Sequence, residues 1–271
     1  RLDARGDRRD DVGDLEPGSA FGADFARFCV GCAVVFGYDG LHDYEGAHMA
    51  ALRTLELNPE NGRGLYHLAD LHLIWGEMEE ARALYEKALA LDPNIPDAWV
   101  GLLFALDLIP GVTAEEALAT RKRFADEHET RARPYRRHHF MTHNPDRQLR
   151  IGYISSDFRD HTAAYMFGPL YEHHDRDRFL VFSYSGVRVE AEDSVGEWFR
   201  KASNAWRNIY GCDPKVVADA IADDQIDILI DTAGYTNGGH LPVFAYKPAP
   251  LAVQAFGYLT GSGMSTMDAI L

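Results

Sequence analysis

Asp157, Arg159 and His161 bring a carboxylate, a guanidinium and an imidazole together within five residues, at the end of the stretch LRIGYISSDFRDH. Side chains of these types can bind a polar ligand and move protons. The run from Leu149 to Ile154 is apolar and dense in β-formers, which predicts a buried strand of a parallel sheet. The three polar side chains therefore follow the carboxyl end of a strand, where open α/β sheets bind their ligands.

Two further loops of the same kind follow predicted strands. The run IDILID, at 226–231, leads into AGYTNGG, and the run LAVQAFGY, at 251–258, leads into LTGSGM. Glycine clusters in such loops let the backbone approach a ligand closely or expose its N–H groups. None of the loops matches GxGxxG, GxxxxGK followed by Ser or Thr, or GxSxG, so the sequence does not support a nicotinamide site, a P-loop or a hydrolase nucleophile.

Alternating strands and helices must position these loops. Between the first and fourth strands, helices are predicted at 165–174, 195–203 and 214–223, and strands at 179–184 and 205–210. Pro214, after the capping residue Asp213, marks the start of the last of these helices. The alternation implies a parallel sheet with right-handed crossovers, and we assign it to an α/β lobe at 148–271.

The first half of the chain carries a different period. Pro59 and Pro93 are 34 residues apart and belong to the similar phrases LRTLELNPEN and YEKALALDPN. This spacing is typical of tetratricopeptide repeats, which pair antiparallel helices. Gly76 breaks the chain between two such helices, and Ala69 and Ala81 are small where the helices cross. The residues predicted to fill the helix seam are Leu68, Leu84, Tyr85 and Ala88, and those predicted to face solvent are Glu77, Glu79 and Glu80.

We assign the repeats to 28–112 and expect them to be the last turns of a longer array, because two or three repeats are marginal alone. Two interpretations of the repeats stay open: recognition of peptides or proteins along a concave face, and a scaffold for the lobe that follows. Residues 1–27 have little to bury and are predicted to be frayed or disordered. Residues 113–147 are predicted to form a helical linker that ends in a basic stretch.

Neither the cysteines nor the histidines favour a metal site. Cys29 and Cys32 form a lone CxxC, for which small buried residues at a helix crossing are favoured over a zinc site. His138, His139 and His143 lie in the basic end of the linker without a carboxylate or cysteine at ligand spacing. A solvated connector is therefore the favoured interpretation of this segment.

Composition excludes several classes of function. The formal net charge of −15 argues against a nucleic-acid surface, and no apolar run approaches the roughly 20 residues that span a bilayer. Three cysteines give no disulfide framework, which favours a reducing cytoplasm. Because the chain starts at Arg1 and ends inside the apolar run MDAIL, we expect a fragment of a longer protein.

Tetratricopeptide repeats followed by LRIGYISSDFRDH, IDILIDTAGYT and KPAPLAVQAFGYLTGSG resemble the O-linked N-acetylglucosamine transferase family over about residues 28–271. The resemblance implies a helical solenoid followed by the first Rossmann-like lobe of a GT-B-type glycosyltransferase. It implies transfer of N-acetylglucosamine from UDP-N-acetylglucosamine to Ser or Thr of proteins, with inversion and without a metal or other cofactor. It also implies a second lobe that supplies most contacts to uridine and diphosphate, and that lobe is expected to be absent from this chain.

The resemblance also implies roles for individual residues. His161 matches the histidine proposed as the catalytic base or substrate-orienting group, although its spacing alone favours a loop histidine that hydrogen-bonds the neighbouring strand. The residues predicted to contact substrate are Asp157, Tyr235, Thr236, Gly257, Tyr258 and Gly261. Turn geometry and packing under the sheet edge are the alternative interpretation of Thr236, Gly257 and Tyr258. Leu259 stands where the family has proline, which predicts a looser loop.

The leading hypothesis is a protein glycosyltransferase whose first lobe alone is inactive. It would act on acceptor proteins or peptides bound along the repeats and on a UDP-sugar, with no nucleic-acid or membrane partner. The alternative is a repeat-based interaction module with a non-catalytic sheet domain. A third interpretation keeps the enzyme but changes the donor sugar or the acceptor.

The expected absence of a nucleotide lobe gives a direct prediction. The isolated chain should bind UDP no more tightly than about millimolar, a free energy of roughly −4 kcal/mol, because most of the nucleotide contacts would be missing. Isothermal titration calorimetry measures this affinity. Micromolar binding would contradict the expectation that the donor site lies mostly on another lobe.

Overall fold

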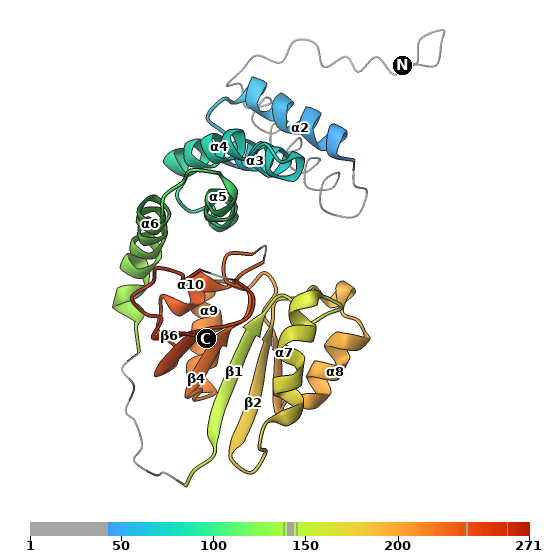
Figure 1. Ribbon diagram of the computed structural model, residues 1–271, viewed down its shortest axis with the longest axis vertical. Coiled ribbons are helices and arrows are strands. Elements are labelled where there is room, and N and C mark those ends of the chain that lie inside the picture. The colour runs from blue at the N-terminus through green and yellow to red at the C-terminus, as the bar shows by residue number, and fades with distance from the viewer. Residues whose placement is uncertain (1–42, 138, 140–143, 145, 237, 259) are drawn as a thin grey trace. The chain divides into compact units, whose positions relative to one another are not determined.

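The computed structural model describes residues 43–271, except 138, 140–143, 145, 237 and 259 (Figure 1). The chain divides into two compact units, 1–105 and 106–271. The predictions for the frayed start at 1–27, for the CxxC of Cys29 and Cys32 and for repeat positions before residue 43 lie outside the described residues. So do those for His138, His143 and Leu259.

The described part of the first unit is helical. Its helices are α2 (Tyr44–Leu57), α3 (Gly62–Trp75), α4 (Met78–Leu91) and most of α5 (Pro96–Leu108). Asp43 caps α2 by accepting a hydrogen bond from the Gly46 N–H, and Asn61 caps α3 in the same way through Gly64. Gly76 ends α3 in the left-handed region at φ 83°, so the turn to α4 forms where a glycine was predicted.

The seam between α3 and α4 is filled largely as the 34-residue period predicts. Leu68, Tyr85 and Ala88 are buried, while Glu77, Glu79 and Glu80 are exposed. Leu84 was predicted to fill the seam, but it is only partly buried, and Leu89 is buried instead.

Tyr85 is the central side chain of this unit. Its hydroxyl donates a hydrogen bond to Asp70 on α3, and its ring lies against Gly101 on α5. A Cβ at position 101 would stand 2.3 Å from the Tyr85 ring, so glycine is required for the two helices to approach. One aromatic side chain thereby joins three helices.

The second unit consists of the end of α5, a long helix and an α/β lobe. Its further elements are α6 (Ala114–Ala132), η1 (Arg133–Tyr135), β1 (Leu149–Ser155), α7 (Thr162–His173), β2 (Phe179–Ser185), η2 (Val189–Ala191), α8 (Ser194–Ala202), β3 (Ala205–Asn208), α9 (Pro214–Asp223), β4 (Ile228–Asp231), α10 (Leu241–Phe244), β5 (Leu251–Gln254) and β6 (Ala269–Ile270). All strand pairs are parallel, and the order is β3-β2-β1-β4-β5-β6. This is the doubly wound order of a Rossmann-like lobe, which confirms the predicted fold class.

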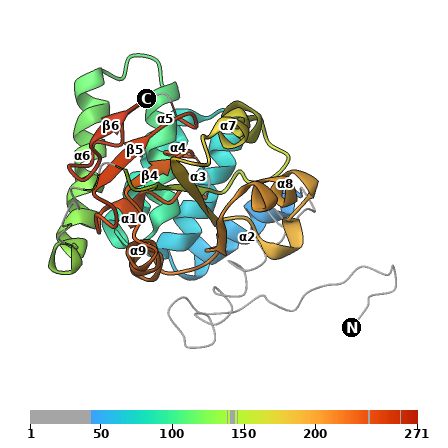
Figure 2. The ribbon, with the colours of Figure 1, turned by 90° about the horizontal axis from the view of Figure 1, so that it is seen from below.

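Helices cover both faces of the sheet. In Figures 1 and 2, α7 and α8 lie together on one face, and α9 lies on the other. An aromatic core fills the α7–α8 side, where Phe158, Phe167, Tyr171 and Phe199 are almost fully buried against β1 and β2. Because both faces are covered, the inner strands β1 and β4 are mostly apolar, although β1 contains Arg150 and β4 ends in Asp231.

Two predicted boundaries were wrong by three residues or more. The last long strand was predicted over 251–258, but β5 ends at Gln254, and Phe256 takes the left-handed region at φ 68°, which no strand residue can do. The helix predicted at 165–174 begins earlier, at Thr162, because His161 caps it.

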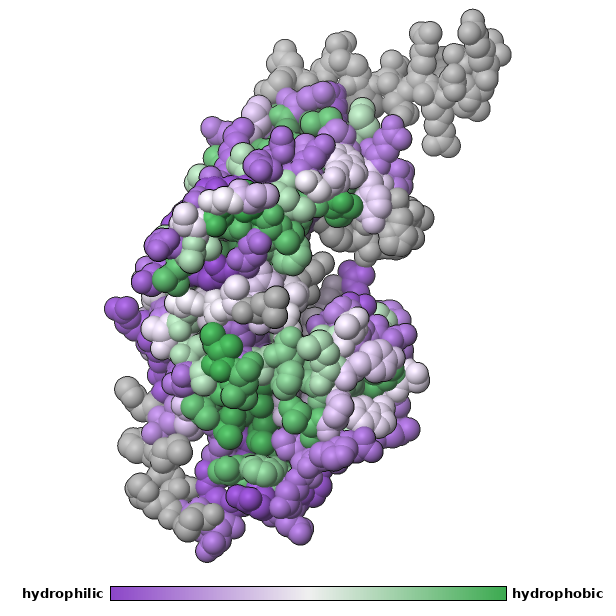
Figure 3. All heavy atoms as spheres, in the orientation of Figure 1, coloured by the Kyte–Doolittle hydropathy of each residue, from purple (hydrophilic) through white to green (hydrophobic). Residues whose placement is uncertain are grey.

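Hydrophobic side chains also reach the surface of the second unit. Figure 3 shows them gathered on one side of the sheet unit, and Leu251 and Ile270, on the adjacent strands β5 and β6, are 39% and 58% exposed. None of the helices in the described ranges is long and apolar enough to cross a membrane.

The burial of Leu68 allows a test of the repeat frame. Leu68→Ala should lower the free energy of unfolding by about 2–4 kcal/mol, because it removes buried methyl groups and leaves a cavity. Leu91→Ala is the matched control: Leu91 is 42% exposed, and the loss should stay below about 1 kcal/mol. Urea unfolding followed by circular dichroism measures both, and a loss below ~0.5 kcal/mol at Leu68 would disprove the frame.

Candidate active site

Three loops meet at the carboxyl edge of the sheet. They follow β1, β4 and β5, and we name them loop 1 (156–161), loop 2 (232–240) and loop 3 (255–268). In the register of the sheet, Ile154 pairs with Asp231, and Asp231 pairs with Gln254. The three strands therefore end level with one another, and the predicted convergence of the loops follows from that register.

His161 lies at the end of loop 1 and is the N-cap of α7. Its Nδ1 accepts a hydrogen bond from the Ala163 N–H at 3.3 Å and lies 3.3 Å from Asp157 Oδ1. The side chain is 42% exposed. Within the described residues no partner lies within hydrogen-bond distance of Nε2. The imidazole is thus held at one nitrogen and open at the other.

Asp157 is the buried partner of this histidine. Its side chain is only 8% exposed, and Arg159 Nη2 lies 4.0 Å from its Oδ1. Burial raises the pKa of the Asp157 carboxyl, while the charges of His161 and Arg159 oppose the rise. Loop 1 therefore holds a carboxylate that contacts the imidazole and has little contact with solvent.

Asp231, the last residue of β4, is a second buried carboxyl at this edge. It accepts hydrogen bonds from the N–H groups of Ala233 at 3.2 Å and Gly234 at 2.9 Å, which fixes the first turn of loop 2. Burial raises the pKa of Asp231 to about 6, with a further contribution from Asp157 and opposition from the two N–H groups. Sequence reasoning treated Asp231 only as the end of a strand; the available signal was a carboxyl closing an apolar run.

The side chains of Tyr235 and Thr236 in loop 2 form hydrogen bonds within the protein. Tyr235 is fully buried, its hydroxyl donates to the Ser262 carbonyl at 2.5 Å, and its ring packs edge-on against Phe124 of α6. Thr236 Oγ1 donates to the Ala233 carbonyl at 3.0 Å. These contacts are packing and turn geometry, so any contact of Tyr235 with substrate would have to come through its backbone.

Loop 3 lies directly against loop 2. A Cβ at Gly257 would stand 1.8 Å from the Thr232 carbonyl oxygen, so only glycine lets the two backbones approach this closely. Tyr258 follows, and its hydroxyl donates to Asp107 Oδ2 at 2.6 Å. A Cβ at Gly261 would meet the Ile270 side chain at 2.8 Å. Gly257 therefore serves close packing of loops 2 and 3, whereas Gly261 leaves room for the Ile270 side chain of β6.

A second imidazole at this edge was missed by sequence reasoning. His240 ends loop 2, and its Nε2 lies 3.3 Å from Ser156 Oγ, which donates to the Gly238 carbonyl. Burial lowers the pKa of His240 to about 4, so it is neutral at physiological pH. A Cβ at Gly186 would stand 2.2 Å from this nitrogen, which places the end of β2 against it. His240 thus joins loops 1 and 2.

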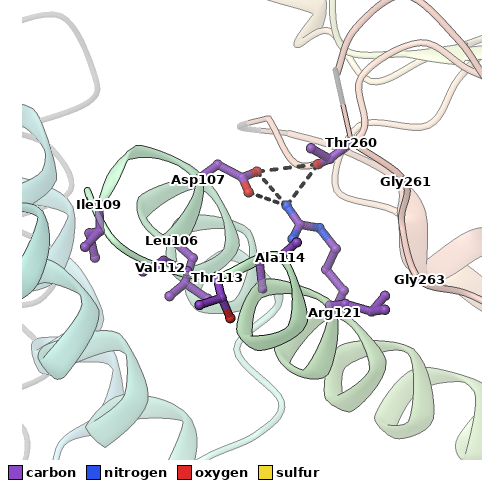
Figure 4. A pocket seen from close by; sticks show the side chains of 12 residues that line it. Leu106, Asp107, Ile109, Val112, Thr113, Ala114, Arg121, Thr260, Gly261 and Gly263 are labelled. Carbon is purple, nitrogen blue, oxygen red and sulfur yellow. Dashed lines mark hydrogen bonds and ion pairs between the residues drawn. The ribbon is translucent and has the colours of Figure 1, made fainter.

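A hollow of about 510 Å³ adjoins loop 3 (Figure 4). It is lined by the end of α5, the connection to α6, the first turns of α6, and Thr260, Gly261 and Gly263 of loop 3. At its polar corner, Arg121 Nη2 donates to both oxygens of Asp107, at 2.5 and 2.6 Å, and to Thr260 Oγ1 at 2.9 Å. Tyr258 and Thr260, which flank Leu259, are therefore both tied to Asp107 or Arg121.

Part of the basic stretch of the linker is docked: Arg136 and His139 are partly buried, whereas Arg133 and Arg137 are exposed. Arg136 Nε donates to the Ala245 carbonyl at 3.0 Å, and His139 Nε2 lies 2.8 Å from the Lys247 carbonyl oxygen. This part of the prediction was wrong because it ignored the carbonyl groups after α10. Among the described residues, no group of three or more His, Cys, Asp or Glu side chains is placed to hold a metal ion.

Two regions of the chain match models of known protein families. Residues 125–271, more than half of the chain, match the model of glycosyl transferase family 41, and residues 62–95 match a tetratricopeptide repeat. The chain belongs to glycosyl transferase family 41. The region of the match contains all three loops, His161 and α10.

Curated relatives of this family 41 chain carry transferase names. A protein of Oryza sativa subsp. japonica named probable UDP-N-acetylglucosamine–peptide N-acetylglucosaminyltransferase SPINDLY is 32% identical, over 68% of this chain and 20% of its own length. A protein of Arabidopsis thaliana with the same name is 38% identical over 46% of this chain and 14% of its own length. A Caenorhabditis elegans protein named UDP-N-acetylglucosamine–peptide N-acetylglucosaminyltransferase is 37% identical over 49% of this chain and 11% of its own.

The family 41 chain spans at most about a fifth of the length of these relatives. Among solved structures, a mutant of the O-GlcNAc transferase of Thermobaculum terrenum matches with a TM-score of 0.63 and 24% sequence identity. The match covers 93% of this chain and 54% of that one. At this identity the likeness establishes a shared fold.

The ion pair at the hollow gives a test of how loop 3 is held. Arg121 is 6% exposed at its side chain, so Arg121→Ala should remove charge-assisted hydrogen bonds to Asp107 and Thr260 and cost about 1.5–3 kcal/mol of unfolding free energy. Hydrogen exchange at the amides of Thr260 and Gly261 should accelerate because their anchor is gone. Chemical denaturation and exchange mass spectrometry measure the two effects.

Lys201→Ala is the control for Arg121→Ala. Lys201 is 75% exposed and lies 3.4 Å from Glu197 on α8, and its loss should cost less than about 0.5 kcal/mol. Equal effects of the two substitutions, or unchanged exchange in loop 3, would show that Arg121 does not hold the loop.

Proposed function

We propose that this chain contributes the first catalytic lobe and adjoining repeats of a protein glycosyltransferase. The proposed reaction moves N-acetylglucosamine from UDP-N-acetylglucosamine to a Ser or Thr hydroxyl, by an inverting and metal-independent mechanism. Membership of family 41 and the names of the curated relatives support this reaction. The observation that carries the proposal is an imidazole at the carboxyl edge of the sheet with one nitrogen anchored and the other open.

The chemistry requires a base at that place. In an inverting displacement the acceptor oxygen attacks the anomeric carbon as the bond from that carbon to the diphosphate oxygen breaks, and UDP leaves with the bonding electron pair. The acceptor hydroxyl must lose its proton during the attack. His161 Nε2 takes that proton in our proposal, as a histidine can at physiological pH.

The remaining predicted site residues keep their proposed roles near the substrate: Asp157, Tyr235, Thr236, Gly257, Tyr258 and Gly261. The hydroxyls of Tyr235 and Tyr258 bond to Ser262 and Asp107, so these side chains would shape loops 2 and 3. Contacts to the sugar would then come from the backbone of the loops. Gly257 supports this, since it lets the backbone of loop 3 lie against that of loop 2 at the edge.

Acceptor proteins or peptides are proposed to lie along the concave face of the repeats, with the repeat region at 28–112, the linker at 113–147 and the lobe at 148–271. A UDP-sugar is the proposed donor, and the net charge of −15 agrees with the absence of nucleic acid from the proposed partners. We propose that the reaction takes place in the cytoplasm.

The alternative function is a repeat-based interaction module with a non-catalytic sheet domain. The engagement of Tyr235 and Tyr258 in packing favours it, because two predicted substrate residues are used to hold loops. Reading the complete gene distinguishes the two functions. The enzyme requires a second Rossmann-like lobe for the nucleotide, whereas the interaction module does not.

His161 is tested in the product of the complete gene. His161→Asn should lower the rate of sugar transfer by roughly 10²–10⁴-fold, the usual contribution of a general base. Asparagine retains an oxygen that can cap α7 at Ala163, so the melting temperature should change little. Transfer is measured with labelled UDP-N-acetylglucosamine and an acceptor protein.

His173→Ala is the matched control, because His173 is exposed at the other end of α7 and contacts only the Pro169 carbonyl among the described residues. It should keep normal turnover. Near-normal turnover of His161→Asn would remove His161 from the mechanism, and loss of folding would assign it a structural role.

A further inference from the structure

Nδ1 of His161 has two neighbours with opposite requirements. The Ala163 N–H, at 3.3 Å, can bond only to a lone pair on Nδ1. The Asp157 Oδ1 also lies 3.3 Å from Nδ1, at ion-pair distance and without a hydrogen bond in this structure, and it could bond to Nδ1 only if Nδ1 carried a proton. A neutral imidazole carries one proton. Whichever neighbour bonds more strongly to Nδ1 therefore decides whether the free lone pair is on Nδ1 or on Nε2.

We expect a hydrogen bond from Nδ1–H to the Asp157 carboxylate to be stronger than one from the Ala163 N–H to Nδ1. A hydrogen bond to an ionised carboxylate is about twice as strong as one between neutral groups. Asp157 is 8% exposed, and such burial weakens the competition of water for its oxygens. The Ala163 N–H is one of the first N–H groups of α7, which have no partner within the helix and can be satisfied by water.

The charged groups around Asp157 bear on whether it stays ionised. The Arg159 guanidinium, 4.0 Å away, favours the ionised form, and Asp231 opposes it. Asp231 has a pKa raised to about 6, so it becomes protonated before a normal aspartate as the pH falls, and its opposition then weakens. Asp160 and Asp193 complete the acidic surroundings of loop 1, and Asp193 accepts from the Asp160 N–H at 2.6 Å.

We propose that Asp157 is a positioning residue that sets the tautomer of His161. Its carboxylate accepts a hydrogen bond from Nδ1–H, which leaves the lone pair on Nε2 at the open edge of the sheet. This proposal rests on the proposed function, in which Nε2 takes the proton of the acceptor hydroxyl. Once Nε2 has taken that proton, the imidazolium lies beside the buried carboxylate, which stabilises its charge without accepting the proton.

This role differs from the substrate contact predicted for Asp157. The carboxylate is nearly inaccessible and is directed to the imidazole, so it acts on the reaction through His161. Without it, the Ala163 N–H would hold the lone pair of Nδ1 and place the proton on Nε2. Nε2 would then be a donor, and the base would be lost although the ring had not moved.

The tautomer is read directly from the full 271-residue chain, without any activity measurement. Long-range ¹H–¹⁵N correlation spectra report which ring nitrogen of a neutral imidazole carries the proton. The wild type should show Nδ1–H at His161, and Asp157→Ala should show Nε2–H. Asp160→Ala is the matched control: it removes an exposed carboxylate of the same loop, bonded to the Tyr165 hydroxyl at 2.9 Å, and should leave Nδ1–H in place. An Nε2–H tautomer in the wild type would overturn the proposal, even if Asp157→Ala failed to fold.

Kinetics of the complete gene product give a second test. Asp157→Ala should lower kcat by roughly 10²–10⁴-fold, the usual contribution of a general base, because Nε2 would carry a proton in place of a lone pair, and change KM less than about twofold. Asp157→Glu keeps a carboxylate that can only accept a hydrogen bond from Nδ1–H and should recover part of kcat. A kcat within about twofold of wild type for Asp157→Ala, where His161→Asn is impaired, would overturn the proposal. Normal turnover of His161→Asn would instead refute the proposed base, while the wild-type tautomer would still decide the role of Asp157.

Discussion

The parallel register of β1, β4 and β5 is the constraint on which the candidate site depends. Ile154, Asp231 and Gln254 lie side by side, so the chain leaves the sheet at one level on three neighbouring strands. The loops then compete for the same space, and glycine at 257 lets one backbone lie against the carbonyl of Thr232. A shift of register on any of these strands would separate the residues that the site brings together.

The two buried carboxyls at the carboxyl edge of the sheet, Asp157 and Asp231, have different roles. Asp231 is fully enclosed and organises the turn of loop 2 through two backbone N–H groups. Asp157 is nearly enclosed and faces an imidazole that reaches solvent. The same physical effect, loss of water around a carboxyl, raises the pKa of both. Their roles differ because their partners differ. Asp231 accepts hydrogen bonds from two backbone N–H groups, whereas Asp157 lies beside the imidazole whose Nε2 is the proposed base.

The helix before the sheet is part of the site's support. Arg121 and Glu129 of α6 both reach loop 3, the first through Thr260 and the second through the Ser265 N–H at 2.6 Å. Phe124, on the same helix, packs against Tyr235 of loop 2. Loop 3 therefore has anchors on both sides of position 259. Tyr258 is held by Asp107 at the end of α5, and Thr260 by Arg121 of α6, which the sequence identified only as a linker.

The sequence by itself determined what repeats locally. The 34-residue period located the seam of Leu68 and Tyr85, and apolar runs between turn residues located the strands and the edge that carries His161. Tertiary structure alone decided where β5 stops, that Asp107 and Arg121 meet Thr260, and that His240 meets Ser156. The reason is physical: helix and strand periodicity is encoded in neighbouring residues, whereas these contacts join segments far apart in the chain and exist only after the sheet has set their distance.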